Sequence, residues 1–236
     1  MSVRLEAVLF DFAGTLFMPA PPRDMMAAAL RELGLRLDQA EIERLAADYA
    51  RVGIAGGPYP SRVPDALARL YAERDLSAGN HRRAYIGLLA EVAGPDARLP
   101  ETFYDQLLRP ESWVPYAEAA EVVATLEDRG VVTGLISNVG FDLRPILRAH
   151  GFASLAECLT MSYEVSAAKP SPEIFRAALA TLATKPEQTL MVGDNAEADD
   201  GGLALGMPTL LLPMTAPGTR HGLELVLRLA GTPAHG

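Results

Sequence analysis

The sequence contains a single cysteine, Cys158, in 236 residues. One cysteine can form neither an intrachain disulfide nor a cysteine-rich zinc site. No stretch approaches the roughly 18 uninterrupted apolar residues of a membrane-spanning helix. The N-terminal segment carries Glu6 ahead of a short apolar run, which is not typical of a signal peptide. We therefore expect a cytoplasmic protein that is folded by its own core and has no membrane partner.

Lysine is also scarce, because only Lys169 and Lys185 occur beside 19 arginines. The formal net charge of −9 argues against electrostatic binding to the backbone of a nucleic acid. Hydrophobic residues make up 49% and charged residues 22%, which is typical of a globular protein rather than a disordered one. We expect a monomer or homodimer that binds no nucleic acid.

Residues 20–109 differ from the rest of the chain, because apolar side chains recur there at helical spacing and prolines and glycines mark the breaks. No alternating strand pattern is evident in this segment. The helices that this pattern predicts cover residues 24–33, 38–52, 63–71, 80–92 and 100–108.

The remaining sequence alternates between short apolar runs and amphipathic segments. This alternation is typical of an α/β fold with a doubly wound, buried parallel sheet covered by helices on both faces. We predict an α/β core from residues 1–17 and 111–236, and a second, all-helical cap domain from residues 18–110. The predicted strands cover residues 7–10, 131–136, 157–161, 189–192 and 209–212, and the predicted helices 117–128, 143–150, 172–184 and 198–205.

Polar residues follow several of these apolar runs or precede a helix. In doubly wound sheets, ligands bind beyond the carboxyl ends of the strands, so we expect these residues to share one cleft. The combination of carboxylates, hydroxyls and one ammonium group suits a phosphoryl group and a divalent cation. The candidates are Asp11, Gly14 and Thr15 after the first run, Ser137 and Asn138 after the second, Lys169 before a helix, and Asp194 with Asp199 after a later run.

Elementary chemistry suggests a role for several of these side chains. The carboxylate of Asp11 can attack phosphorus and form an aspartyl-phosphate. Asp11 and Asp194 are hard oxygen ligands of the kind that Mg²⁺ prefers. Lys169 can stabilise the transferring phosphoryl group, and Ser137 offers it a hydroxyl. Gly14 allows a close approach of the backbone to phosphate oxygens.

Together these motifs resemble those of the haloacid dehalogenase superfamily of hydrolases. The segment Asp-Phe-Ala-Gly-Thr-Leu that starts at Asp11 is similar to the nucleophile loop, and the other motifs follow in the family's order. The resemblance implies a mobile cap after this loop. It also implies Mg²⁺ bound by Asp11, by the backbone carbonyl of Ala13 and by Asp194, with Asp199 supporting the metal site. We expect Gly14, Thr15 and Asn138 to bind substrate phosphate.

One position departs from the family pattern. Phosphatases of this family carry a second aspartate two residues after the nucleophile, where this chain has Ala13. That aspartate acts as general acid and base, a contribution typically of about 10²–10⁴-fold in rate. We favour a phosphatase that uses a substitute acid, or a substrate whose leaving group needs none. A weakly catalytic or non-catalytic phosphometabolite-binding protein remains an alternative.

Two other hydrolase classes in this superfamily also lack the second aspartate. Phosphonoacetaldehyde hydrolases have a similar loop but use a cap lysine as a Schiff base, and no lysine lies between Leu16 and Pro115 here. Dehalogenases work without a metal and have a less acidic last motif than this chain. The four histidines show no metal-ligand spacing, so we expect surface or capping roles for them. Tyr59, Trp113 and Tyr116 line the cleft or pack the core.

Overall fold

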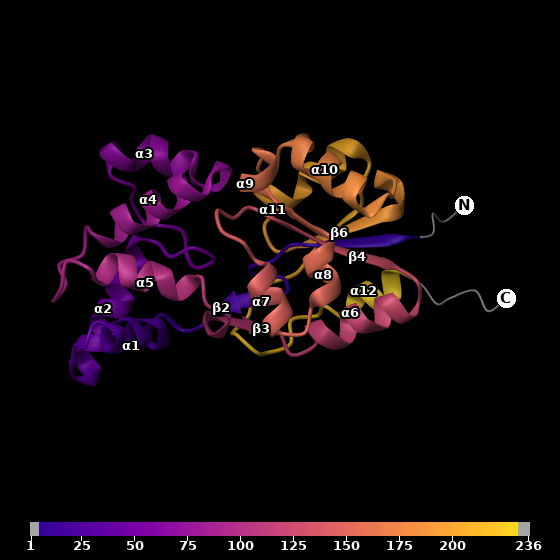
Figure 1. Ribbon diagram of the computed structural model, residues 1–236. Helices are drawn as coiled ribbons and strands as arrows, with labels where there is room; N and C mark the ends of the chain where they lie inside the picture. The colour runs from indigo at the N-terminus through magenta and orange to yellow at the C-terminus, as the bar shows by residue number, and fades with distance from the viewer. Residues whose placement is uncertain (1–4, 231–236) are drawn as a thin grey trace.

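The computed structural model describes residues 5–230, which form a five-stranded parallel sheet flanked by helices and a separate group of helices (Figure 1). The strand order is β5-β4-β1-β6-β7, which confirms the predicted doubly wound α/β class. The strands are β1 (Ala7–Phe10), β4 (Val132–Ser137), β5 (Leu159–Met161), β6 (Thr189–Gly193) and β7 (Thr209–Leu211).

The central strand β1 pairs in parallel with β4 on one side and β6 on the other, so Ala7 lies opposite Val132 and Thr189. All of β1 is buried, as expected for a strand covered on both faces. Alternate residues contribute to different cores: Val8 belongs to one apolar cluster and Leu9 to the other. The first cluster includes residues of α6 (Ala119–Asp128), and the second residues of α10 (Pro172–Leu182).

Helices cover the two faces of the sheet, and in Figure 1 α10 lies on the opposite side from α6. The carboxyl ends of the strands point toward the helical group, while the ends of the described chain lie at the far side of the core. The remaining short core helices are α7 (Arg144–Ala149), α8 (Ala153–Glu157), α9 (Ser162–Val165), α11 (Ala196–Asp199) and α12 (Leu225–Leu229), with 3₁₀ turns η2 (Pro110–Ser112), η3 (Pro186–Gln188) and η4 (Asp200–Leu205).

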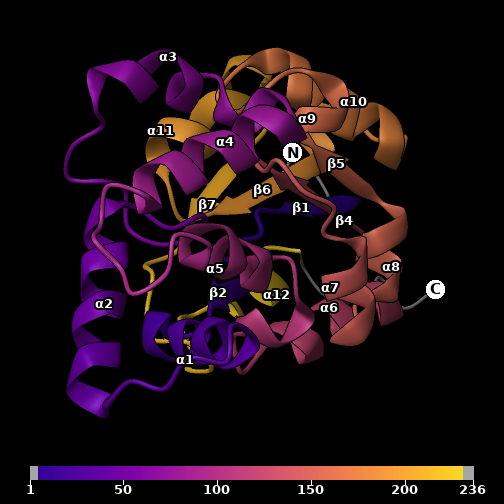
Figure 2. The ribbon, with the colours of Figure 1, turned by 60° about the vertical axis from the view of Figure 1, so that its left-hand side comes forward.

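The helical group lies between β1 and α6 in the sequence and beside the sheet in space (Figure 2). All five helices predicted for this segment are present, with ends displaced by a few residues. The cap domain boundaries at 18 and 110 remain a prediction. The helices are α1 (Pro22–Glu32), α2 (Gln39–Val52), α3 (Asp65–Ala72), α4 (Ala78–Leu89) and α5 (Leu99–Leu107), with the 3₁₀ turn η1 (Arg74–Leu76) between α3 and α4.

The short helices α8, α9 and α12 are absent from the sequence prediction, and two further features differ from it. A short antiparallel ribbon of β2 (Phe17–Pro19) and β3 (Trp113–Pro115) joins the helical group to the core. Strands of three residues, each ending in proline, are too short to show an alternating pattern. The helix predicted at 198–205 is instead the four-residue α11 followed by η4, where consecutive glycines disfavour a continuous α-helix. Among residues 5–230, no helix is long and apolar enough to cross a membrane.

Candidate active site

A cavity of about 810 Å³ lies between the carboxyl ends of the strands and the helical group. Its core side is lined by side chains from four separate segments of the sequence, namely Asp11, Ser137, Lys169 and Asp194. Their convergence is the arrangement that the strand-end argument predicts. The helical group, α1 to α5, is called the cap below. Residues of α3, η1 and α4 line the cavity from this side. A small molecule bound in this cavity would therefore contact both parts of the chain.

Lys169 occupies the centre of the polar cluster. Its Nζ donates hydrogen bonds of 2.6 Å to Oδ1 of Asp11 and 2.6 Å to Oδ1 of Asp199. The lysine is only 6% exposed, so this ion pair is well shielded from water. A buried ammonium group is stable only with such partners. The two carboxylates raise the pKa of Lys169 against the opposing effect of burial, so the side chain stays charged.

Asp199 holds the adjacent turn together through its second oxygen. Oδ2 accepts hydrogen bonds from the backbone amides of Asp194 at 3.1 Å and Asn195 at 3.0 Å. Both carboxylate oxygens of Asp199 are thus already engaged, one by Lys169 and one by backbone amides. This arrangement fits a residue that orients Asp194 and Lys169 around a metal site, which is a common function of residues just outside the ligand set.

Asn138 fixes the backbone of the lysine. Its Oδ1 accepts a 2.7 Å hydrogen bond from the Lys169 amide, and its Nδ2 donates a 2.9 Å hydrogen bond to the Lys169 carbonyl. The Asn138 side chain lines the cavity, where phosphate contact is predicted for it. Its two hydrogen bonds also position the backbone of Lys169. Ser137, at the end of β4, also lines the cavity and is buried.

In the loop after Asp11, Gly14 packs against Asp194, whereas Thr15 is buried away from the cavity. Gly14 adopts a φ of 95°, and a Cβ built there would lie 2.5 Å from Cγ of Asp194. Glycine is therefore required for Asp194 to approach the loop. Thr15 does not line the cavity: its side chain is fully buried, and its Oγ1 has no hydrogen-bond partner within residues 5–230. The structure does not bring the Thr15 hydroxyl to the predicted phosphate site.

Ala13 lies on the cavity wall, opposite the cap. A Cβ built on Gly56, in the loop that follows α2, would be 3.5 Å from the Ala13 Cβ. The alanine methyl thus faces the cap at the position where a family phosphatase carries an acid. No proton can be exchanged by this side chain.

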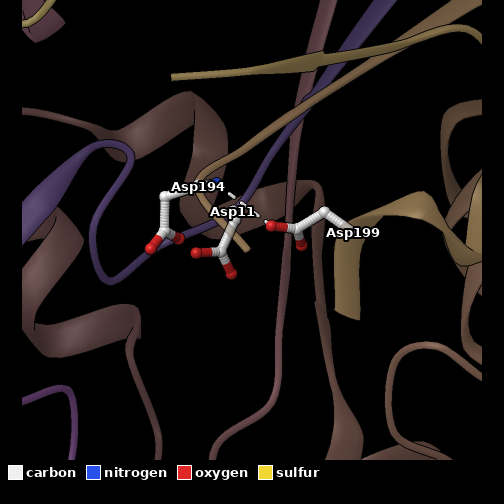
Figure 3. Close-up of side chains that lie close together, drawn as sticks. All are labelled: Asp11, Asp194 and Asp199. Carbon is white, nitrogen blue, oxygen red and sulfur yellow. Dashed lines mark hydrogen bonds between the residues drawn. The ribbon is translucent and has the colours of Figure 1, made fainter. Parts of the chain in front are cut away.

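The three carboxylates of Asp11, Asp194 and Asp199 are close enough to hold a metal ion. One oxygen from each lies within 4.8 Å of the others, and Figure 3 shows the Asp11 carboxylate between the other two. Burial, aided by the charges of Asp199 and Asp194, raises the pKa of Asp11 to about 7 even though Lys169 lowers it. Burial and the charge of Asp199 raise the pKa of Asp194 to about 6. A hard divalent cation relieves this repulsion between carboxylates, so the donor set fits Mg²⁺.

The cap contributes polar groups that the sequence analysis did not single out. Arg74 and Asp75 of η1 line the cavity, as do Tyr71 and Tyr85. The Arg74 guanidinium lies 4.1 Å from the centre of the Tyr71 ring, and its Nη2 lies 3.2 Å from Oδ2 of Asp75. Arg74 and Asp75 are adjacent charged residues in a helical segment, and no spacing in the sequence marks them as cavity residues.

The expectation of surface or capping roles is wrong for His81 and His221. His81 also lines the cavity, is 2% exposed, and its Nδ1 lies 2.7 Å from the Tyr104 hydroxyl. Burial lowers the pKa of His81 to about 3, so the ring is neutral. His221 is buried against Tyr116, with ring centres 3.7 Å apart. His150 is half-buried, and its Nε2 lies 3.0 Å from the Pro110 carbonyl oxygen.

His235 lies outside the described residues. Of the three aromatic residues, Tyr59 and Trp113 line the cavity. The Tyr59 hydroxyl accepts a 2.9 Å hydrogen bond from Nδ2 of Asn195, which links the cap to the turn that carries Asp194. Tyr116 does not line the cavity and packs in the core instead.

Comparison with known proteins identifies the family to which this chain is similar. A family profile described as haloacid dehalogenase-like hydrolase matches residues 5–205, which is most of the chain. A phosphoserine phosphatase from Thermus thermophilus is 34% identical over 127 residues, covering 52% of this chain and 50% of that protein. The chain thus spans about half the length of this relative, and of a pyrophosphatase PpaX from Anoxybacillus flavithermus.

Two longer matches cover nearly the whole chain. A ribulose-1,5-bisphosphate 5-phosphatase from Halopiger xanaduensis is 28% identical over 87% of this chain and 83% of its own length. The crystal structure of a HAD phosphatase from Thermococcus onnurineus superposes with a TM-score of 0.60 at 22% identity, over 98% of this chain and 100% of that one. The structural match supports the fold, and the sequence matches are to proteins named as phosphatases.

Proposed function

The chain belongs to the haloacid dehalogenase-like hydrolases, and on this premise we propose that it is a magnesium-dependent phosphatase of small phosphorylated metabolites. The reaction passes through an aspartyl-phosphate on Asp11. Phosphatase-named relatives support the choice of phosphate esters as the substrate class. The cavity of about 810 Å³ is of the size of a small-molecule site.

The observation that carries this proposal is the position of Lys169 between two buried carboxylates. The lysine holds Asp11 at 2.6 Å on the cavity wall, which orients the nucleophile and supplies positive charge where a phosphoryl group would transfer. Asp11, Asp194 and the Ala13 carbonyl would hold Mg²⁺, supported by Asp199. When bound, the metal neutralises charge on the phosphate and reduces its repulsion from Asp11. Ser137 lines the same wall and offers a hydroxyl to the phosphate oxygens.

Phosphate release from para-nitrophenyl phosphate tests the proposal. We expect turnover with Mg²⁺ and loss of turnover with a chelator. Asp11→Asn should abolish activity, because an amide is not a nucleophile toward phosphorus. Retention of most activity in this variant would remove Asp11 from the nucleophilic role.

The same assay separates the alternatives that Ala13 raises. A protein that only binds phosphometabolites would take up Mg²⁺ and inorganic phosphate but release no product from any ester. A dehalogenase would release halide from a haloacid in the presence of chelator. Phosphonatase chemistry would give a borohydride-trapped adduct with phosphonoacetaldehyde, for which the cap offers no lysine between Leu16 and Pro115.

A further inference from the structure

We propose that Asp75, on the cap side of the cavity, is the catalytic acid and base that replaces the aspartate missing at Ala13. This inference rests on the proposed phosphatase function and assigns the one role that the core leaves unfilled. Asp75 lies in η1, far in sequence from the nucleophile, and lines the same cavity as Asp11.

The need for such a group follows from how the core side chains are used. Lys169 is held in two ion pairs, and both oxygens of Asp199 already accept hydrogen bonds. Asp11 is the nucleophile and Asp194 a metal ligand in the proposed reaction. An alkoxide leaving group needs a proton in the transition state, and none of these groups is free to give one.

Asp75 is held firmly at the boundary between cap and core. Its Oδ2 lies 3.2 Å from Nη2 of Arg74, and its Oδ1 lies 3.9 Å from Nε2 of His81. Its backbone carbonyl accepts a 2.6 Å hydrogen bond from the hydroxyl of Ser162 in α9. The side chain is 14% exposed. The carboxylate is thus paired with a cap guanidinium, and its backbone is anchored to the core through Ser162. A carboxyl group carried on an anchored backbone meets the geometric requirement for proton transfer better than one on a mobile segment.

The surrounding charges suit a carboxyl group that changes its protonation state. Burial raises the pKa of Asp75, and the positive charges of Arg74 and Lys169 oppose this effect without cancelling it. Asp75 and Lys169 line the same cavity, so the charge of Lys169 acts on the Asp75 carboxyl group. Arg74 keeps the carboxylate oriented after it has lost its proton.

The other titratable groups on the cap wall are less suited to this role. His81 is neutral, with its pKa lowered to about 3, and its Nδ1 is engaged with the Tyr104 hydroxyl. Burial raises the pKa of Tyr71 and of Tyr85 above that of a free tyrosine, which makes both weaker acids. Glu197 also lines the cavity but is exposed to solvent. Asp75 is therefore the carboxyl group on the cap wall that is largely shielded from solvent and whose pKa is raised by burial.

The proposed reaction balances in two steps. In the first, a carboxylate oxygen of Asp11 bonds to phosphorus, the bond between phosphorus and the ester oxygen breaks, and Asp75 transfers its proton to that oxygen. In the second, the Asp75 carboxylate takes a proton from water, and the water oxygen bonds to phosphorus. The bond between phosphorus and Asp11 then breaks, which releases inorganic phosphate and leaves Asp75 protonated again.

Asp75→Asn tests the assignment because it keeps the shape and a hydrogen-bond acceptor for Arg74 but cannot exchange a proton. The matched control is Glu73→Gln, which removes a half-exposed carboxylate two residues away whose partner is Arg69. For each, kcat/KM is measured with Mg²⁺ on glycerol phosphate and on para-nitrophenyl phosphate. We expect Asp75→Asn to lose about 10²-fold or more on glycerol phosphate but less than about tenfold on the nitrophenyl ester, whose leaving group needs little protonation. Glu73→Gln should resemble the wild type on both.

An equal loss on both esters, or no loss on either, overturns the role of Asp75. A second measurement does not depend on how well the variant folds. Across a series of aryl and alkyl phosphates, kcat/KM of the wild type should depend only weakly on the basicity of the leaving group, and a steep dependence would show that no acid assists. A wild type that releases phosphate from no ester overturns the proposed function itself, and this inference with it.

Discussion

At the scale of single residues, Gly14 allows the nucleophile loop and Asp194 to lie in direct contact. Its φ of 95° is unfavourable for any other residue, and a Cβ there would overlap the Asp194 carboxylate. The position of a proposed metal ligand thus depends on the absence of one carbon atom.

We predict that Gly14→Ala lowers phosphatase activity and Mg²⁺ affinity by at least about tenfold, the usual effect of disturbing the shell around a metal ligand. The control is Gly34→Ala, with a φ of 72° and no atom within 4 Å of the added Cβ. This control should cost roughly 1–2 kcal/mol of stability through backbone strain and leave activity unchanged. Titration with Mg²⁺ and steady-state kinetics give both readouts, and equal affinities in the two variants would contradict the prediction.

His81 gives the protein a specific sensitivity to acid. Its pKa is lowered to about 3 by burial, beside the positive charge of Arg74, against about 6.5 in the unfolded chain. The unfolded state therefore binds more protons below about pH 6.5, and stability is lost as the pH falls through that range. This group alone should cost about 2 kcal/mol between pH 7 and pH 5.

Urea unfolding at the two pH values measures this effect. His81→Gln should reduce the difference in unfolding free energy between pH 7 and pH 5 by about 2 kcal/mol. Tyr104→Phe removes the partner hydroxyl of His81 but keeps the titrating ring, so it should retain most of the difference. If the two variants show the same pH dependence as the wild type, His81 is not the source of the acid sensitivity.

The sequence identifies some of these residues much better than others. Asp11 and Asp194 each follow a buried apolar strand, and parallel strands bring their ends to one edge, so their convergence follows from the fold class. Asp75 and Arg74 lie in a cap turn whose position depends on packing between separate parts of the chain. No spacing in the sequence encodes which face of that turn meets the core.

At the scale of secondary structure, α2 has the most complete helix start in the cap. The Asp38 side chain accepts a hydrogen bond from the Glu41 amide, and the Glu41 side chain accepts one from the Asp38 amide. This capping box satisfies two backbone groups that a helix otherwise leaves unpaired. It also explains why the predicted start at residue 38 agrees with the observed helix to within one residue.

Asp38→Ala should lower the free energy of unfolding by about 1 kcal/mol, the typical value of an N-cap side chain. Gln39→Ala changes the next residue, whose side chain donates a hydrogen bond to the exposed Glu43, and should stay within about 0.5 kcal/mol of the wild type. Urea titrations compare the two. A loss in Gln39→Ala as large as that in Asp38→Ala would show that general helix propensity, not the cap, sets the stability.

At the scale of the whole molecule, the cap and core meet where α4 contacts the loop that follows β4. A Cβ on Gly140 would overlap the Cβ of His81, and two β carbons cannot rotate away from each other. Ser162 adds its hydrogen bond to the Asp75 carbonyl in the same region. The site is therefore complete only with the two parts at close range.

Gly140→Ala should displace α4 and reduce kcat/KM by about 10²-fold, since small displacements of reacting groups have effects of this size. Gly79→Ala places a methyl group at the start of the same helix, with no atom within 4 Å of it, and should leave kcat/KM unchanged. Hydrogen exchange of the α4 amides should rise only in the first variant. Unchanged activity in Gly140→Ala would show that the loop adapts without moving the cap.

The strand order has a consequence for synthesis of the protein on the ribosome. β1 is made first but lies in the middle of the sheet, and its partners are residues 132–135 and 189–192. At about 5–20 residues per second, the nascent chain waits roughly 10 to 40 s before the second partner strand is translated. During that interval the cap helices, which end at residue 107, can form locally. The apolar run at residues 7–10 has no such local partner, so it is the segment of the nascent chain that a ribosome-bound chaperone would need to shield.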